Sequence, residues 1–416
     1  VEPVTGLVLT GGGARAAYQV GVLSALRQLR ARHAPGGRHP FPVIAGTSAG
    51  AINAAVLASG ADDFDATVGQ MLDVWSHFHA GQVYRADALG VIRSGAGWLK
   101  MVSIGWMLAR WRRQKPRSLL NNAPLAELLS RLARLDRVPR MIQEGHLQAL
   151  AVSASSYSSG LHVTFYEAAQ EAVPWVRSQR LAVRQRLSVE HLLASSAIPF
   201  VFPATRLALD DMPEWFGDGS MRQAAPVSPV IHLGATRVLV VGAGRMHEPP
   251  GRRDLNPEYP TLAQIGGHAM SSIFLDTLAV DIERLERINR TLSMMPAEVR
   301  ARTTLRPIEL LVIAPSQRLD DLAAQHLQAL PPMVRALLRG VGVKDQPGAT
   351  SGAALASYLL FEAAYTRELI ALGEADTLAR REEVLRFFGW DQPGRDRKST
   401  RLNSSHSQQS RMPSSA

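Results

Sequence analysis

One serine of the chain lies in a glycine-rich turn whose residue types suit nucleophilic catalysis. Ser48 follows the apolar run F-P-V-I and sits between Gly46 and Gly50 in the pattern G-x-S-x-G. The glycines allow a sharp turn from a strand into a helix, which lifts the serine hydroxyl out of the backbone and places it beside the helix N-terminus. A Gly/Ser loop that merely caps a helix is the alternative, and the pattern alone leaves both interpretations open.

A second glycine-rich turn lies about thirty-five residues upstream of the first. Gly11, Gly12 and Gly13 follow the apolar run G-L-V-L, and Arg15 comes shortly after them. Consecutive glycines let backbone N–H groups approach a reacting centre without a Cβ in the way, and Arg15 adds a nearby cation. The competing interpretation is a dinucleotide-binding turn, but that fold needs an acidic residue at the end of its second strand. Here that place is taken by the turn around Ser48, so the glycines favour an oxyanion hole.

An acidic residue between glycines is the candidate base. Asp218 precedes Gly219 in the run F-G-D-G-S, far downstream of Ser48. Flanking glycines favour a tight loop that aims the carboxylate, although an ordinary Asp-Gly turn has the same residues. A histidine base is the chemical rival, and an α/β-hydrolase places several strands before its nucleophile. Several histidines follow Ser48, and none of these four lies in a motif typical of a catalytic triad: His191, His232, His247 and His268.

The segments around these turns alternate between strand and helix patterns. Helical patterns cover residues 14–32 and 51–59. This alternation predicts an α/β fold with a mostly parallel central sheet flanked by helices. Apolar runs rich in β-branched residues and leucine predict strands at 6–10, 43–45, 148–154, 162–167 and 237–241.

The pattern changes beyond a Pro/Gly/Arg-rich link at residues 249–253. Helical patterns cover 267–291 and most of 319–388, with a predicted strand at 307–314 between them. We therefore expect a catalytic domain at 1–248 and a mainly helical C-terminal region at 249–395. An appended helical domain and a helical layer on the sheet both fit this region.

Composition excludes some classes of function. The chain has 416 residues and no cysteine, so disulfides and thiolate chemistry are excluded. No apolar run approaches the roughly twenty residues of a membrane span, and no signal peptide is visible, although the chain begins at Val1 and an upstream segment stays open. The net charge is +10, but the arginines form no stripe with interleaved aromatics, so we expect no nucleic-acid partner. No cluster has metal-ligand spacing.

The last residues of the chain, 396–416, have a composition unlike the rest of the sequence. Residues 396–416 resemble the in-frame translation of a sequencing-library adapter, and we exclude them from the fold as a non-native tail. A genuine serine-rich disordered tail is the alternative.

Taken together, the motifs resemble those of the patatin-like phospholipases of bacterial type. G-G-G-A-R at 11–15, G-T-S-A-G at 46–50 and D-G-S at 218–220 occur in the family's order, and the resemblance covers roughly residues 5–245. Ser220 departs from the family, which usually has Gly or Ala there. Three further segments support the resemblance: 118–125, 194–200 and 225–235.

The resemblance implies a three-layer patatin-like fold and a serine acyl hydrolase with a Ser–Asp dyad. Asp218 then takes the proton of Ser48, and the N–H groups of Gly11, Gly12 and Gly13 hold the oxyanion. The acyl-enzyme is released by water that Asp218 activates, without a metal or cofactor. A phospholipid or another acyl ester is the implied substrate. An acyltransferase or thioesterase with the same site, and a catalytically silent lipid-binding scaffold, are the alternatives.

A segment at residues 97–115 suits contact with a membrane surface. Trp98, Trp106 and Trp111 alternate there with aliphatic residues, and Arg and Lys gather at one end. Such a composition is typical of segments that rest on anionic headgroups, and a cap helix over the active site is the alternative. We expect a cytoplasmic or peripheral membrane protein, and the sequence leaves its oligomeric state open.

Overall fold

A mixed β-sheet forms the centre of the molecule. The computed structural model describes residues 3–85, 118–169, 172, 174–246, 259–343 and 352–391. Within them the strands are β1 (Thr5–Leu9), β2 (Val43–Thr47), β3 (Ala149–Ser156), β4 (His162–Ala168), β5 (Val176–Arg177), β6 (Arg180–Arg184), β7 (Thr205–Leu209), β8 (Met212–Asp218), β9 (Arg237–Val241) and β10 (Glu309–Ile313). Their order is β10-β9-β1-β2-β3-β4-β6-β5, with β8 paired to β3 and β7 paired to β8.

The half of the sheet that carries the glycine turns is parallel. β10, β9, β1, β2 and β3 pair in parallel, and Leu9 lies opposite both Gly46 and Val241. Strands β1 and β2 therefore end at the same edge, which brings the two glycine turns together. The predicted α/β fold with a mostly parallel sheet is confirmed. In the other half, the strand expected at 162–167 is present as β4. The antiparallel pairing was not predicted: β4 and β8 pair antiparallel with β3, and β7 and β8 form a hairpin.

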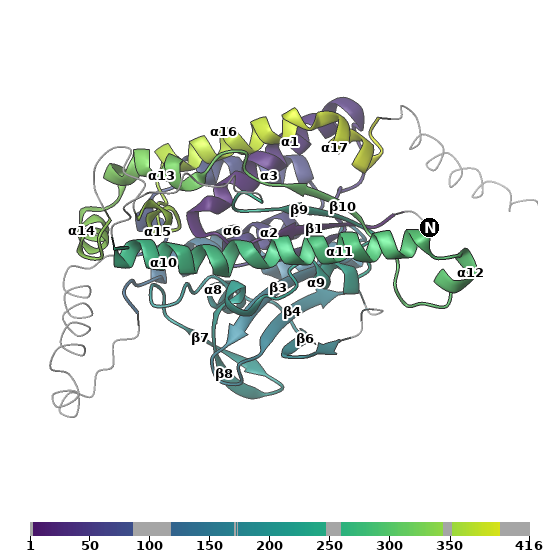
Figure 1. Cartoon of the computed structure of the whole chain (residues 1–416), viewed down its shortest axis with the longest axis horizontal. Coiled ribbons are helices and arrows are strands. Elements are labelled where there is room, and N and C mark those ends of the chain that lie inside the picture. The colour runs from purple at the N-terminus through teal and green to yellow at the C-terminus, as the bar shows by residue number, and fades with distance from the viewer. Residues whose placement is uncertain are drawn as a thin grey trace, which may run out of the picture.

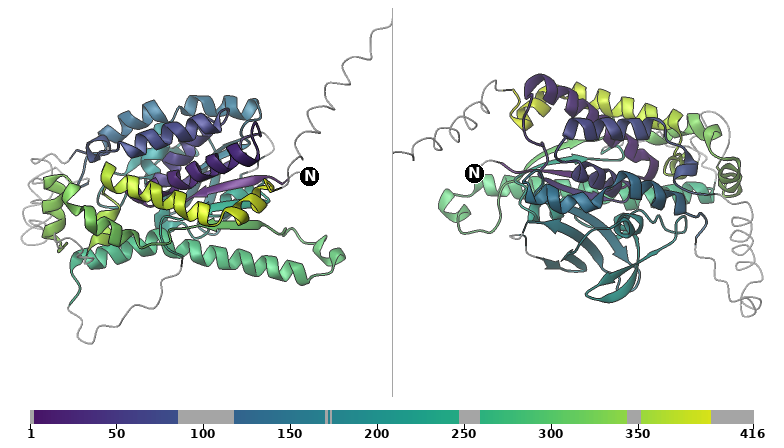
Figure 2. Two further views of the ribbon diagram at one scale, coloured as in Figure 1. Left: turned by 90° about the horizontal axis from the view of Figure 1, so that it is seen from above. Right: turned by 180° about the vertical axis from the view of Figure 1, so that it is seen from behind.

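Helices cover both faces of this sheet (Figures 1 and 2). The longer ones are α1 (Ala17–His33), α2 (Ala49–Ser59), α3 (Phe64–Ser76), α6 (Ala123–Leu132), α10 (Leu262–Ser271), α11 (Thr277–Met294), α14 (Pro332–Gly340) and α16 (Ala363–Ala379). The shorter ones are α7 (Val138–Gln143), α8 (Val189–Ser195), α9 (Ser228–His232), α12 (Ala297–Arg300), α13 (Leu319–His326), α15 (Ala353–Ser357) and α17 (Arg381–Phe388). Single 3-10 turns are η1 (Gly13–Ala16), η2 (Ala80–Gln82), η3 (Leu135–Arg137), η4 (Gly219–Arg222) and η6 (Leu327–Ala329), and η5 (Ser272–Asp276) is a π-helical turn.

The alternation of side chains along β1 shows how the layers form. Leu7 and Leu9 belong to the core shared with α1, α2, α3 and α16, whereas Val8 points to the opposite core, which includes residues of α9 and α11. Successive side chains of a strand face opposite sides of a sheet, so a strand that is apolar throughout must be covered on both faces. The result is the expected three-layer arrangement.

The residues beyond 259 form part of these same layers. Strand β10 extends the sheet beside β9, and α16 packs closely on α1, where a Cβ at Gly21 would overlap the backbone of Ile370. Of the two possibilities left open by the sequence, the structure shows a helical layer with one added strand.

Three predictions fall on residues that the structure does not describe. The boundary at 248/249, the tail at 396–416 and the segment at 97–115 all lie outside the described residues. Among the residues that are described, no helix is both long enough and apolar enough to cross a membrane.

Candidate active site

Ser48 occupies the sharp turn between β2 and α2. Its backbone has φ 56° and ψ −131°, a conformation that non-glycine residues rarely adopt. Backbone strain of this kind persists where the surrounding structure holds it, and it concentrates at functional sites. Ser48 is 1% exposed and immediately precedes the first residue of α2, so its hydroxyl lies at the positive end of that helix.

The glycines of the predicted motif permit this close packing. A Cβ at Gly46 would lie 2.5 Å from the Cα of Ala51, inside the turn itself. A Cβ at Gly50 would overlap the carbonyl oxygens of Leu9 and Thr10 at the end of β1. Both positions therefore require glycine because helix α2 approaches the backbone of the two strands directly.

Asp218 ends strand β8 and points at Ser48. The Ser48 hydroxyl donates a hydrogen bond to Asp218 Oδ2 at 2.6 Å, and the backbone N–H of Ser220 donates to Oδ1 at 2.9 Å. Burial raises the pKa of Asp218 to about 6, against the hydrogen bonds from Ser48 and Ser220, which lower it. A carboxylate with that pKa is mostly ionised at neutral pH and a better base than an ordinary aspartate.

Other residues fix the two partners in place. The backbone N–H of Ser48 donates to Ser195 Oγ at 2.9 Å, and Ser195 in turn donates to the carbonyl of Ser153 at 2.6 Å. Gln223 donates to the hydroxyl of Thr47 at 2.6 Å. These roles were not predicted from the sequence, although Ser195 lies in one of the segments that supported the family resemblance.

The glycine turn at 11–13 lies beside the aspartate loop. A Cβ at Gly11 would overlap the Ser220 hydroxyl, and a Cβ at Gly219 would overlap the carbonyl of Ser153. Thus the loops after β1 and β8, more than two hundred residues apart in the sequence, meet at one place. The serine at position 220, where the family usually has Gly or Ala, fits between them.

Arg15 has a different environment from the one expected. The residue is 2% exposed, and its guanidinium forms an ion pair with Asp320. The charge is therefore balanced within the protein, and Arg15 connects the glycine turn to the C-terminal region.

Three of the four histidines considered as a base lie within the described residues. His191 lies close to Ser188, with Nδ1 3.1 Å from the backbone N and 3.0 Å from Oγ, and its ring packs on Phe165. His232 stacks on Trp175. His268 is exposed on α10, and His247 lies outside the described residues.

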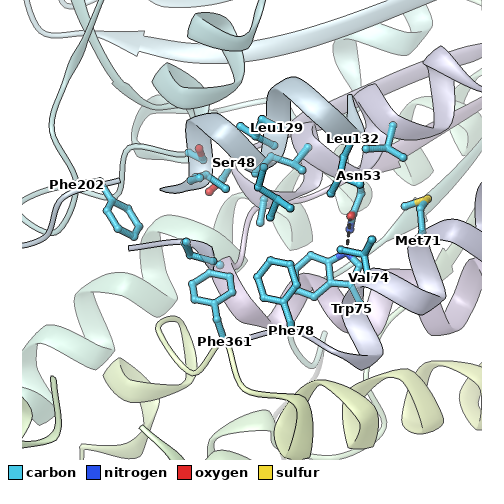
Figure 3. A pocket seen from close by; sticks show the side chains of 18 of the residues that line it. Ser48, Asn53, Met71, Val74, Trp75, Phe78, Leu129, Leu132, Phe202 and Phe361 are labelled. Carbon is cyan, nitrogen blue, oxygen red and sulfur yellow. Dashed lines mark hydrogen bonds between the residues drawn. The ribbon is translucent and has the colours of Figure 1, made fainter. Parts of the chain in front are cut away.

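An apolar pocket opens beside Ser48 (Figure 3). It encloses about 710 Å³, a volume that includes the part open to solvent. In Figure 3, Met71 and Leu132 lie at the end away from Ser48. The walls come mainly from α2, α3 and α6, with three phenylalanines from other segments: Ile52, Val56, Met71, Val74, Trp75, Leu125, Leu128, Leu129, Leu132, Phe78, Phe202 and Phe361.

Two polar residues of the pocket wall, Asn53 and Trp75, are hydrogen-bonded to each other. Trp75 Nε1 donates to Asn53 Oδ1 at 3.0 Å, the contact drawn in Figure 3. Asn53 Nδ2 donates to Gln19 Oε1 at 3.0 Å, and Gln19 donates to the carbonyl of Thr10 at 2.7 Å. Because its N–H is satisfied, the indole of Trp75 can present an apolar surface to the pocket.

A family model provides the deciding comparison. The model described as patatin-like phospholipase matches residues 7–231, which is more than half of the chain and includes both glycine turns and Asp218. The chain belongs to the patatin-like phospholipase family. No curated protein sequence matches it.

The similar solved structures are distant. Human GIVD cytosolic phospholipase A2 has 10% identity and a TM-score of 0.42, with 93% of this chain and 60% of that chain covered. VipD from Legionella pneumophila has 13% identity and a TM-score of 0.31, with 89% and 67% covered. ExoU bound to SpcU, from Pseudomonas aeruginosa, has 15% identity and a TM-score of 0.24, with 97% and 90% covered. The patatin-like chain thus spans about three fifths of the human enzyme's length.

Proposed function

We propose that the protein hydrolyses fatty-acyl esters of lipids, with Ser48 as nucleophile and Asp218 as general base. The observation that carries the proposal is the 2.6 Å hydrogen bond from the Ser48 hydroxyl to a buried carboxylate, beside an apolar pocket. A nucleophile within hydrogen-bond reach of its base is the geometry that such catalysis requires.

The proposed reaction has two steps. Asp218 takes the Ser48 proton as Oγ attacks the ester carbonyl, and the tetrahedral oxyanion forms at the N–H groups of Gly11, Gly12 and Gly13. The protonated Asp218 then gives its proton to the departing alcohol, which leaves an ester between Ser48 and the fatty acid. In the second step Asp218 takes a proton from water, the hydroxide attacks the acyl-enzyme, and the proton returns to Ser48 as the fatty acid leaves.

The pocket supports a substrate with a long apolar chain. Its lining is mainly aliphatic and aromatic, and the polar atoms of Asn53 and Trp75 are hydrogen-bonded within the protein. An acyl chain that fills the pocket removes apolar surface from water, which favours binding by about 0.8 kcal/mol for each buried CH₂ group. A phospholipid has such a chain next to the ester that Ser48 attacks.

Hydrolysis of p-nitrophenyl octanoate by the full chain tests this proposal. We expect Ser48→Ala and Asp218→Asn each to lose at least about a thousandfold in kcat, since removing one member of a catalytic unit has effects of that size. Asp73→Asn makes the same chemical change on the exposed surface of α3 and is expected to behave as wild type. Activity that survives in Ser48→Ala would refute the nucleophile, and activity that survives in folded Asp218→Asn would refute the base.

A further inference from the structure

A buried arginine connects the glycine turn to the C-terminal region. Besides its ion pair with Asp320, Arg15 donates hydrogen bonds from Nε and Nη2 to Ser357 Oγ at 2.8 and 2.6 Å. The guanidinium also lies 4.0 Å from the centre of the Tyr358 ring. These partners come from α13, α15 and the residue after α15, so two segments far along the chain converge on one side chain.

The backbone of the turn also rests on Tyr358. The N–H of Ala14 donates to the carbonyl oxygen of Tyr358 at 3.1 Å. Gly13 has φ +55°, and a Cβ there would overlap the same carbonyl. Residue 13 therefore must be glycine both for its left-handed conformation and for its contact with the C-terminal region.

Phe274 packs against the turn as well. It lies in the π-helical turn η5 between α10 and α11, is 3% exposed, and stacks on the Tyr358 ring with 5.0 Å between centroids. A Cβ at Gly11 would lie 2.8 Å from its Cδ1 atom. π-helical turns within α-helices are rare and occur frequently at functional sites. Gly11 and Gly13 are thus held by a stacked pair of rings and a carbonyl from beyond residue 259.

These C-terminal contacts lie outside the part of the chain that the family model covers. The model ends at residue 231, whereas Phe274, Asp320, Ser357 and Tyr358 all follow it. Stabilisation of an oxyanion depends on donors held in place before the reaction, and a misplacement of about 1 Å can cost about a hundredfold in rate. A turn of three glycines has little stiffness of its own, so its position must come from its neighbours.

We propose that Asp320 and Ser357 are positioning residues of this enzyme. They act through Arg15 to hold the N–H groups of residues 11–13 where the oxyanion forms, and they touch neither the substrate nor Ser48. The inference rests on the proposed function, because it assigns a role in that reaction to the C-terminal region.

The test uses Asp320→Asn in the full chain. With p-nitrophenyl octanoate we expect kcat to fall by about ten- to hundredfold while KM stays within about twofold, because only the transition state carries the oxyanion. A long-chain trifluoromethyl ketone, which adds Ser48 to form a tetrahedral oxyanion, is expected to lose affinity by a similar factor. Free octanoate, which occupies the pocket without that adduct, is expected to bind as it does to wild type.

Matched variants separate positioning from a general loss of structure. Asp321 is exposed in the same first turn of α13, so Asp321→Asn is expected to keep wild-type kcat and ketone affinity. Ser357→Ala removes one acceptor of Arg15 with little change in volume, and it serves as the second variant if Asp320→Asn does not fold.

Two results would overturn the inference. One is wild-type kcat and ketone affinity in the folded variants at 320 and 357. The other is a parallel loss of ketone and octanoate affinity, which indicates a general loss of structure. A wild-type protein that hydrolyses no acyl ester would instead refute the proposed function itself.

Discussion

The two walls around Ser48 differ in what they contribute to the fold. The polar wall contains a buried carboxylate, a serine with φ 56° and a turn of three glycines, all of which are unfavourable for stability. The apolar wall, built from α2, α3 and α6, contains leucine, valine, methionine and tryptophan side chains whose burial favours folding. Under the proposed function, the polar wall is kept for chemistry, whereas the apolar wall serves both stability and substrate choice.

The largest expected effect on stability is a gain when the buried charge is removed. Burial raises the pKa of Asp218 from 3.8 to about 6, so the folded protein binds more protons than the unfolded chain between those pH values. Unfolding free energy therefore falls as pH rises through that window, and the ionised carboxylate costs up to about 3 kcal/mol at pH 7. We expect Asp218→Asn to raise the unfolding free energy at pH 7 by about 1–3 kcal/mol, measured by urea denaturation.

The exposed aspartate at position 73 serves as the control for this stability measurement. Asp73→Asn is expected to change the unfolding free energy by less than about 0.5 kcal/mol, as is usual for surface substitutions. If Asp218→Asn is instead less stable than wild type at pH 7, the ionised Asp218 does not lower the unfolding free energy of the folded protein.

A smaller effect is expected at the far end of the apolar wall. A larger side chain at Leu132, which lies away from Ser48 in Figure 3, shortens the space for an acyl chain. For Leu132→Trp we compare kcat/KM for the p-nitrophenyl ester of a sixteen-carbon acid with kcat/KM for that of a four-carbon acid. We expect the ratio of the first to the second to fall by about tenfold, which corresponds to about 1.4 kcal/mol. Leu337→Trp on α14, where the leucine is also half-buried but outside the pocket, is expected to leave this ratio unchanged. An unchanged ratio in Leu132→Trp would contradict the acyl-chain assignment.

The smallest effect concerns the serine at position 220. Because Asp218 must be ionised to act as a base, kcat/KM is expected to fall tenfold per pH unit below about pH 6. The Ser220 N–H and hydroxyl lower the pKa of Asp218. Loss of the hydroxyl in Ser220→Ala is therefore expected to move the acidic limb of the kcat/KM–pH profile to higher pH by less than about one unit. A limb that moves to lower pH would show that Ser220 does not stabilise the ionised aspartate.

Local patterns in the sequence predicted the parts of the site that depend on local structure. Ser48 and the glycine turns follow apolar strands, and a parallel arrangement necessarily brings the ends of β1 and β2 together. The hairpin β7–β8 that delivers Asp218 was missed, although the alternating run T-R-L-A-L followed by Asp210-Asp211 is a usable signal. Both aspartates have positive φ in the structure, which is typical of a two-residue hairpin turn.

Contacts between distant segments could not be predicted in this way. Nothing in the local pattern around Arg15 indicates Asp320 as its partner, because the two residues are about three hundred residues apart. They pair only because α13 packs against α15 and α16 in the folded chain. The apolar residues of α3 and α6 have the spacing of any core helix, and only their arrangement in space leaves a pocket between them.

Mass spectrometry of the protein quenched during turnover tests the central claim most directly. Wild type and Asp218→Asn are each mixed with p-nitrophenyl octanoate, and the wild-type reaction is quenched in acid within the first turnovers. In both proteins we expect an octanoyl group on the peptide that contains Ser48. The adduct is expected to form faster in wild type than in Asp218→Asn and to be absent from Ser48→Ala. An active wild-type enzyme that never carries the acyl group on Ser48, or that carries it on another residue, would contradict the account.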